Sequence, residues 1–439
     1  MRPAGQWRAD REDAVKRLWE ANASSILSRN LIVMLVAVFV MRFGEGILGG
    51  VRTNFFLDTL GLSAGQVLWL EGIRELPGLA LVFIAALTMH LPLSRRAAIS
   101  VLVMGIGYGL QSSVRSYGAL LAVAVVASFG MHGYQPLHPA LGISLTTRDK
   151  AGRVMGALAS AGALATITGM GAVALASGLA ARQPGVGALS LRLPYVAGGA
   201  LIILAAALMW RLPTDIGHTE TPPQRMLFRR RYWLFYVLTF FEGARKQVLS
   251  GLGTLVLVQN HGWQVWQVSA LLVVSSILSM LTAPLLGYCV DRFGERVTTP
   301  ASYAGLALCC VGFAVLSNAW FLAGLWVAIK LLLTLGLGLS TYVGRTAPRE
   351  ELTPTLSAGV SINHISSVLM PMLSGLLMPI ISYSGVFLLT AGILLASVPF
   401  ARALRTGGCP PVGGCPPVGG CPPVGGEQAA PAGAELRSA

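Results

Sequence analysis

The sequence predicts an all-α integral membrane protein, with twelve transmembrane helices in two pseudo-symmetric bundles of six. Three observations predict this fold. Of 439 residues, 54% are hydrophobic and only 11% are charged, whereas about 25% of a soluble domain is charged. Twelve apolar stretches approach or exceed the ~20 residues that a bilayer-crossing helix needs. The basic residues between these stretches concentrate on one side of the membrane, as cytoplasmic loops require.

This composition excludes several other classes of protein. A soluble multidomain chain needs more charge to cover its surface, and a disordered chain has fewer apolar residues. Six cysteines in 439 residues are too sparse for a small disulfide scaffold. Because basic cytoplasmic loops account for the net charge of +14, no nucleic acid partner is expected.

Each span is predicted from its own apolar run. Residues 1–30 are polar and precede the first run, so we expect a cytoplasmic tail and a retained first helix rather than a cleaved signal. The predicted spans are 31–57, 64–88, 97–114, 118–140, 154–180, 195–210, 233–258, 264–288, 298–316, 319–343, 355–379 and 384–401.

The side of each connection follows from its Lys and Arg content. Of the 32 basic residues, 23 lie in connections on the side of the N-terminus, three on the opposite side and six within spans. This distribution predicts both termini in the cytoplasm and the chain in the cell's inner (plasma) membrane.

A basic, proline-containing connection divides the spans six and six. We therefore expect an N-terminal bundle at 31–211, a cytoplasmic linker at 212–232, a C-terminal bundle at 233–404 and a disordered Pro/Gly/Cys repeat tail at 405–439. In that tail, Cys409, Cys415 and Cys421 recur every six residues. A repeat expansion without function is favoured there over metal binding or lipidation.

An offset of 201 residues aligns parts of the two halves without gaps. Gly61 falls on Gly262, and Gln66 and Val67 fall on Gln267 and Val268. Internal duplication is the usual origin of such a match. The alternative is chance similarity between apolar helices.

Residues 287–296 carry the most specific motif of the chain. They read Gly-Tyr-Cys-Val-Asp-Arg-Phe-Gly-Glu-Arg, which resembles the G-x-x-x-D-R-x-G-x-R signature of the major facilitator superfamily. The resemblance implies that the glycine permits close helix packing. It also implies that the aspartate pairs with a helix N-terminus and a nearby arginine, locking one access state. The residues concerned are Gly287, Asp291, Arg292, Gly294 and Arg296.

The equivalent loop of the first half departs from this signature. Ala86 replaces the glycine and His90 the aspartate, while Arg95 is retained. This departure puts the gating contact of the first half in doubt. His90 there is either a pH-sensitive element or, as we favour, a solvated loop histidine.

Ten formal charges lie within the predicted spans. Facing lipid, ten charges would cost on the order of 25–35 kcal/mol, more than a typical folding free energy of about 5–15 kcal/mol. They must therefore face a wet cavity, pair with one another or lie near an interface. The resemblance implies that spans 1, 4, 7 and 10 line such a cavity. The charges are Arg42, Glu45, Arg52, Glu71, Arg74, Glu75, Glu242, Arg245, Lys246 and Lys330.

Helical spacing predicts how these charges group. Glu71, Arg74 and Glu75 share one helix face, either as a structural salt-bridge network or as a substrate and proton site. Glu242 is spaced to reach Arg245 and Lys246.

Other polar side chains in the spans have competing interpretations. Lys330 has no acidic neighbour in its own helix, which favours a functional role. Arg52, near the outer end, is expected to snorkel to the interface. Glu45 and Glu242 are the first candidates for proton transfer. His132 and His364 follow, although a structural hydrogen bond is favoured for each.

These features predict a secondary active transporter of a small organic solute, working by alternating access. The charge of the spans, +2, favours an organic anion or zwitterion, and protons are the expected coupling ion. Membrane lipids are expected around a monomer. No enzyme activity, cofactor or metal site is expected, because motifs of zinc proteases, nucleotide motors and zinc ribbons are absent. The alternative is a sensor or scaffold that kept the fold and lost transport.

Overall fold

A computed structural model describes residues 28–80, 88, 90–147, 150–182, 190–216, 228–335, 339, 342–343 and 346–404. Our predictions for both tails, for Ala86 and for most of the linker lie outside these residues. The chain divides into two units, Met1–Thr406 and Gly407–Ala439. All the described residues lie in the first unit.

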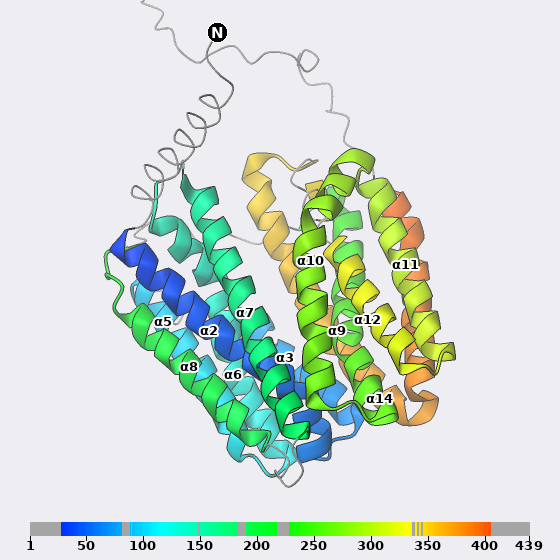
Figure 1. Ribbon diagram of the computed structural model, residues 1–439. Helices are drawn as coiled ribbons and strands as arrows, with labels where there is room; N and C mark the ends of the chain where they lie inside the picture. Colours follow the sequence, from blue (N-terminus) through cyan, green and yellow to red (C-terminus); the bar gives the residue numbers. More distant parts are fainter. Residues whose placement is uncertain are drawn as a thin grey trace, which may run out of the picture. The chain divides into compact units, whose positions relative to one another are not determined.

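The described residues form helices and turns and no strand, which confirms the all-α prediction. The last long helix, α14, breaks at Ser382, where φ is 57°. This break falls between the last two predicted spans, so α14 corresponds to two of them. In chain order (Figure 1), the helices are α2 Arg29–Asn54, α3 Ala64–Leu79, α5 Leu93–Leu110, α6 Tyr117–Ser144, α7 Ala151–Ala181, α8 Arg192–Trp210, α9 Trp233–His261, α10 Val265–Phe293, α11 Glu295–Val315, α12 Ala319–Thr334 and α14 Arg349–Arg402, with short turns η1 Phe55–Thr59, η2 Gln111–Ser113 and η4 Arg230–Tyr232.

Seven of the helices in the described part of the chain are long and apolar enough to cross a membrane. One of them is the broken stretch Pro354–Arg402, and α12 is a shorter apolar helix. Charged residues interrupt the apolar character of α3 and α9, which carry three each near their middles. These are the helices in which the sequence predicts buried charge.

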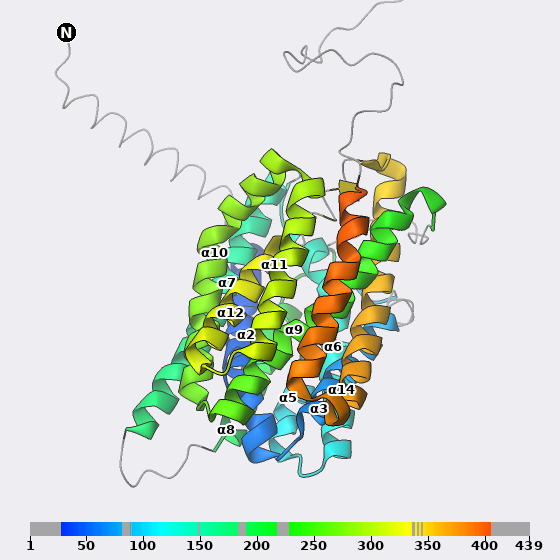
Figure 2. The same cartoon turned by 90° about the vertical axis from the view of Figure 1, so that its right-hand side faces the viewer.

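The helices pack as two bundles that adjoin each other (Figures 1 and 2). In the first bundle, α2 packs against α7 and α8, and α5 packs against α6 and α8. In the second, α14 packs against α9 and α11, and α10 against α12. The bundles meet where α3 contacts α14 and where α7 contacts α10. A site between the bundles can therefore draw side chains from both halves.

The same turn recurs in the two halves at the predicted offset. Gly61 and Gly262 have left-handed φ values of 63° and 64°, a conformation that glycine adopts without steric cost. Each is followed by a capping box, in which the side chains of Gln66 and Gln267 bond back to the N-cap backbone of α3 and α10. This repeated geometry supports duplication over chance similarity.

Hydrogen bonds between the bundles fasten the end at which Gly61 and Gly262 lie. Thr53 donates to Thr254 at 3.2 Å, and these residues are 201 positions apart. A residue bonded to its own repeat equivalent lies near the pseudo-two-fold axis. Asn54 Nδ2 donates to the Trp263 carbonyl at 3.0 Å and Ser269 Oγ to the Gly50 carbonyl at 2.9 Å. The two bundles are therefore closed against each other at this end.

Candidate functional site

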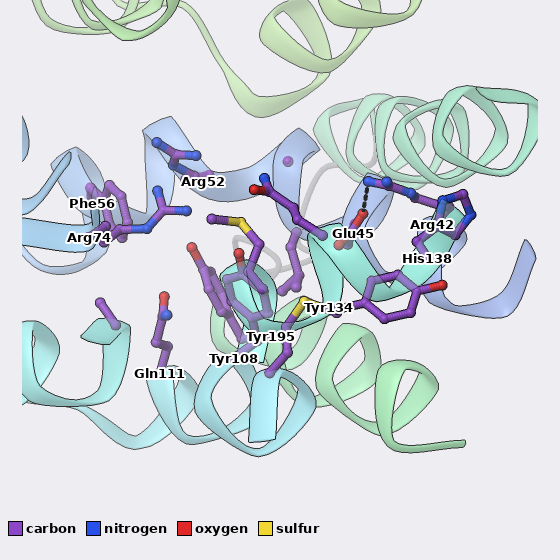
Figure 3. A pocket seen from close by; sticks show the side chains of 16 residues that line it. Arg42, Glu45, Arg52, Phe56, Arg74, Tyr108, Gln111, Tyr134, His138 and Tyr195 are labelled. Carbon is purple, nitrogen blue, oxygen red and sulfur yellow. Dashed lines mark hydrogen bonds and ion pairs between the residues drawn. The ribbon is translucent and has the colours of Figure 1, made fainter. Parts of the chain in front are cut away.

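A polar cavity of ≈ 320 Å³ lies within the first bundle. Figure 3 shows arginine, glutamate and tyrosine side chains around it. Its walls come from α2, α3, α5, α6 and α8. The polar and charged lining residues are Arg42, Glu45, Arg52, Arg74, Tyr108, Gln111, Tyr134, Gln135, His138 and Tyr195.

A second cavity, of ≈ 350 Å³, lies between the bundles. It shares Arg52, Arg74 and Phe56 with the first cavity, so the two are neighbours. Its second-bundle wall includes Trp326 and Lys330 of α12. The same two residues line a third cavity of ≈ 540 Å³ between α7, α10 and α12.

Arg42 and Glu45, three residues apart, pair on one face of α2. The Arg42 Nη1 to Glu45 Oε2 distance is 2.7 Å. The side chains are 44% and 21% exposed, so water reaches both ends of the pair. This ion pair neutralises the cavity wall locally and leaves Glu45 hydrated.

Glu71 lies at the centre of a buried ion-pair network. Its side chain is 9% exposed and accepts hydrogen bonds from Arg52 of α2 and Arg74 of its own helix. Arg74 Nη1 lies 2.9 Å and 3.2 Å from the two carboxylate oxygens. The Glu71–Arg74 grouping therefore agrees with helical spacing. Arg52, which the sequence predicts to snorkel, is ion-paired to Glu71 of α3 and lines both cavities.

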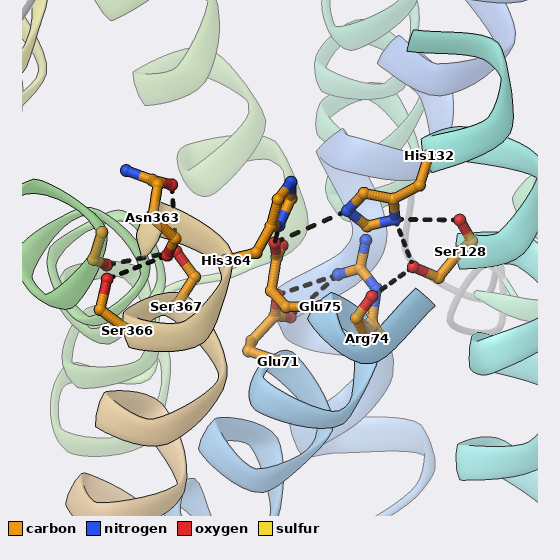
Figure 4. Close-up of polar contacts among 10 residues, drawn as sticks. Glu71, Arg74, Glu75, Ser128, His132, Asn363, His364, Ser366 and Ser367 are labelled. Carbon is orange, nitrogen blue, oxygen red and sulfur yellow. Dashed lines mark hydrogen bonds and ion pairs between the residues drawn. The ribbon is translucent and has the colours of Figure 1, made fainter. Parts of the chain in front are cut away.

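Glu75 is directed toward two histidines from other helices (Figure 4). Its Oε2 lies 3.0 Å from His364 Nδ1 of α14 and 3.6 Å from His132 Nε2 of α6. The two imidazole rings pack edge-on, 5.1 Å between centroids. Three predicted site residues, far apart in sequence, thus form one cluster across the boundary between the bundles.

Lys330 projects into the cavities from α12. Its Nζ lies 4.8 Å from the centre of the Trp326 ring, within the range of a cation–π contact. Among the described residues, no carboxylate pairs with it. Lys330 is therefore a positive charge that a ligand can reach.

The predicted group on α9 is not brought together by ion pairs. Arg245 is 1% exposed and its guanidinium lies 4.2 Å from the Tyr303 ring centre. Its three side-chain nitrogens have no hydrogen-bond partner among the described residues. Glu242 is half-buried and Lys246 is exposed. Neither pairs with a described residue, and none of the three lines the cavities above.

The signature loop joins α10 to α11 away from these cavities. Gly294, at φ 73°, ends α10 and permits the turn. Arg296 Nε donates to the Arg402 carbonyl at 3.1 Å, which ties α11 to the end of α14. Arg292 Nη1 donates to the Tyr288 hydroxyl at 2.7 Å, and Asp291 is exposed. The close packing implied at Gly287 is absent from this state, because a Cβ there would meet nothing within 4 Å.

The aromatic wall of the cavities was missed by sequence reasoning. Tyr108, Tyr134, Tyr195 and Trp326 line them, yet such residues are common in apolar helices and carry no charge signal. His90, in contrast, is exposed in the loop before α5, in agreement with the favoured interpretation.

The sequence profile of the Major Facilitator Superfamily matches residues 34–344 and 235–412. The second match begins in α9, the first helix of the second bundle. A search of curated proteins found no match.

Solved structures share the fold. A mutant of the nucleoside transporter NupG superposes with a TM-score of 0.71 at 15% identity, covering 86% of this chain and all of that one. A bacterial homolog of the human lysosomal transporter Spinster, in an inward-facing and occupied conformation, gives a TM-score of 0.65 at 15% identity, covering 85% and 95%. At this identity the likeness concerns the fold alone. Together with the family match, it identifies this multi-pass membrane protein as a member of the major facilitator superfamily.

Proposed function

We propose that the protein is a secondary active transporter of a small organic anion or zwitterion, coupled to protons. One observation carries the proposal: two neighbouring cavities are lined by charges and aromatic rings, and one of them draws its walls from both bundles. Charge within a membrane span is costly unless it is paired or faces a wet pathway. A transport-inactive sensor has little reason to retain it.

The anionic preference rests on Lys330 and Arg52. Both line the cavity between the bundles. Arg52 shares Glu71 with Arg74, so one carboxylate serves two guanidinium groups. Lys330 pairs with no carboxylate in the described part of the chain. An anionic group between Arg52 and Lys330 would complete the charge balance, and Phe56 and Trp326 offer apolar contact for the remainder of the solute.

Alternating access follows from where the bundles touch. Hydrogen bonds at the Gly61 and Gly262 end hold the bundles together on that side. Rocking of one bundle against the other would break these bonds and expose the same cavity to the opposite side. We place both termini in the cytoplasm of a cell whose inner membrane holds the chain, on the distribution of basic residues. A fluorescent protein fused to the C-terminus should fold and fluoresce if this orientation holds.

Glu242 and Glu45 are our proton carriers. Glu242 has no ion-pair partner among the described residues, and Glu45 is held by one partly exposed arginine. Glu45 is held by one cation rather than two and lines the first cavity, so it can exchange a proton with cavity water, whereas Glu242 lies outside the three cavities. Glu45→Gln and Glu242→Gln should lose pH-dependent uptake in proteoliposomes. Full, pH-dependent transport by both variants would exclude this coupling.

The substrate proposal is tested in two stages. A thermal-shift screen of metabolites on the purified protein identifies a ligand, because binding to the native state raises stability. Uptake of that ligand into proteoliposomes then separates a transporter from a sensor, which would bind without transport. Lys330→Met should reduce uptake of an anionic substrate by at least about tenfold, whereas Arg115→Met, on an exposed connection, should not. Equal uptake of an anion and its isosteric cation would refute the charge preference.

A further inference from the structure

The cluster of Glu75, His132 and His364 has the composition of a transition-metal site. One carboxylate oxygen and two imidazole nitrogens, each from a different helix, lie within 4.8 Å of one another. Two histidines and one carboxylate are a common ligand set for zinc. Bonds of about 2.0–2.1 Å in tetrahedral geometry separate ligand atoms by roughly 3.3 Å, close to the 3.0 Å and 3.6 Å that separate Glu75 from the two rings.

The hydrogen bonds of His132 determine which of its nitrogens faces Glu75 as a lone pair. His132 Nδ1 lies 3.0 Å from the Ser128 carbonyl and 3.0 Å from the Ser128 hydroxyl. A carbonyl only accepts, and the Ser128 hydroxyl donates its hydrogen to the Arg74 carbonyl. The proton of the neutral ring is therefore on Nδ1, and the Nε2 lone pair is directed at a carboxylate (Figure 4).

A lone pair facing a carboxylate oxygen is repulsive unless a proton or a metal ion lies between them. The Nδ1–H bond to a backbone carbonyl is also the arrangement that orients a metal-binding histidine. We propose that Glu75, His132 and His364 bind a divalent transition-metal ion, with zinc as the best-fitting probe. The ion would be bound by His132 Nε2, by His364 Nδ1 and by one or both carboxylate oxygens of Glu75.

The backbone beside the cluster leaves room for these rings. A Cβ on Gly78 would lie 2.6 Å from His364 Nδ1 and 2.9 Å from His132 Cδ2. Glycine at this position is thus what allows both imidazoles to approach α3. Glu75 also lines the cavity between the bundles, which gives an ion a path to the site.

Bound metal would connect the two bundles. Glu75 and His132 belong to the first bundle and His364 to the second, so the complete ligand set exists only where α3 and α14 are in contact. A ligand favours the state that it binds better, and the ion would therefore stabilise the state seen here. This inference does not depend on the identity of the transported solute.

Zinc binding to the purified full-length protein tests the proposal. The tail thiols would be removed first by Cys409→Ser, Cys415→Ser and Cys421→Ser, since thiolates bind zinc themselves. Calorimetry on the metal-stripped protein should then show one site. Cobalt in its place should give visible ligand-field bands, and X-ray absorption should show imidazole nitrogen ligands.

Variants separate the cluster from other zinc-binding groups. Glu75→Gln and His364→Gln should each weaken zinc binding by at least about tenfold. Gly78→Ala, which keeps all three ligands, should weaken it by filling the space between the rings. His90→Gln and His138→Gln, which alter histidines outside the cluster, should bind zinc as the parent protein does.

Three results would overturn the proposal. One is the absence of zinc binding at millimolar concentration. Another is equal affinity in Glu75→Gln, His364→Gln and the parent. The last is a nitrogen NMR spectrum that shows a proton on His132 Nε2 both without and with zinc. That result would make the cluster a proton site instead.

Discussion

Replacing Glu71 by glutamine tests the buried ion-pair network most directly. The carboxylate is 9% exposed and its partner Arg74 is 12% exposed, so water compensates little for the lost charge. Breaking a buried pair from one side costs about 3–5 kcal/mol, because the remaining charge is left uncompensated. At 1.4 kcal/mol per tenfold change, the folded-to-unfolded ratio should fall by roughly 10²- to 10³·⁵-fold. Unfolding of the purified protein by denaturant, followed by tryptophan fluorescence, measures this ratio.

Glu45→Gln is the matched control, because the same substitution there breaks a more exposed pair on the neighbouring helix. An exposed pair contributes at most about 1 kcal/mol. The double variant Glu71→Gln/Arg74→Gln should be less destabilised than the two single changes predict together, since it removes the uncompensated guanidinium as well. The network does not stabilise the fold if Glu71→Gln lowers the free energy of unfolding no more than Glu45→Gln does. The same conclusion follows if the loss in the double variant equals the sum of the losses in the two single variants.

Further predictions concern packing and pH. A Cβ on Gly46 would collide with a backbone carbonyl of α7, so Gly46→Ala should destabilise the folded protein by about 1–3 kcal/mol. Gly156→Ala on α7 is the control, because its Cβ would meet open space. Equal thermal stability of the two variants would contradict this packing. Gly287→Ala should leave the melting temperature of this state unchanged, because its Cβ also meets open space. The Arg231 guanidinium beside Glu351 holds the pKa of that carboxyl below its ordinary value of 4.5. The pair therefore stabilises the folded state above that pH, and this stabilisation is lost as the pH falls below it. The difference in unfolding free energy between the parent and Glu351→Gln should shrink as the pH falls below 4.5. A difference independent of pH would contradict a stabilising role of this ion pair.

The sequence alone determined the all-α class of the fold and the order of its helices. In a bilayer each helix satisfies its own backbone hydrogen bonds and must span a fixed thickness, so the signal of every span is local. The turns at Gly61 and Gly262 show the same locality, since a left-handed glycine and a capping box that begins two residues later specify a helix start without any distant contact. Helical spacing also anticipated the Glu71–Arg74 pair.

Only the tertiary structure decided which charges meet across helices. Arg52 of α2 pairs with Glu71 of α3, and the partners of Glu75 include a histidine 289 residues away. Periodicity within one helix gives the face on which a side chain lies but not the neighbour on that face. The neighbour depends on how the bundles pack, and the apolar pattern of a span does not determine that packing. The cluster at Glu75, where three helices converge beside Gly78, is therefore visible only in three dimensions.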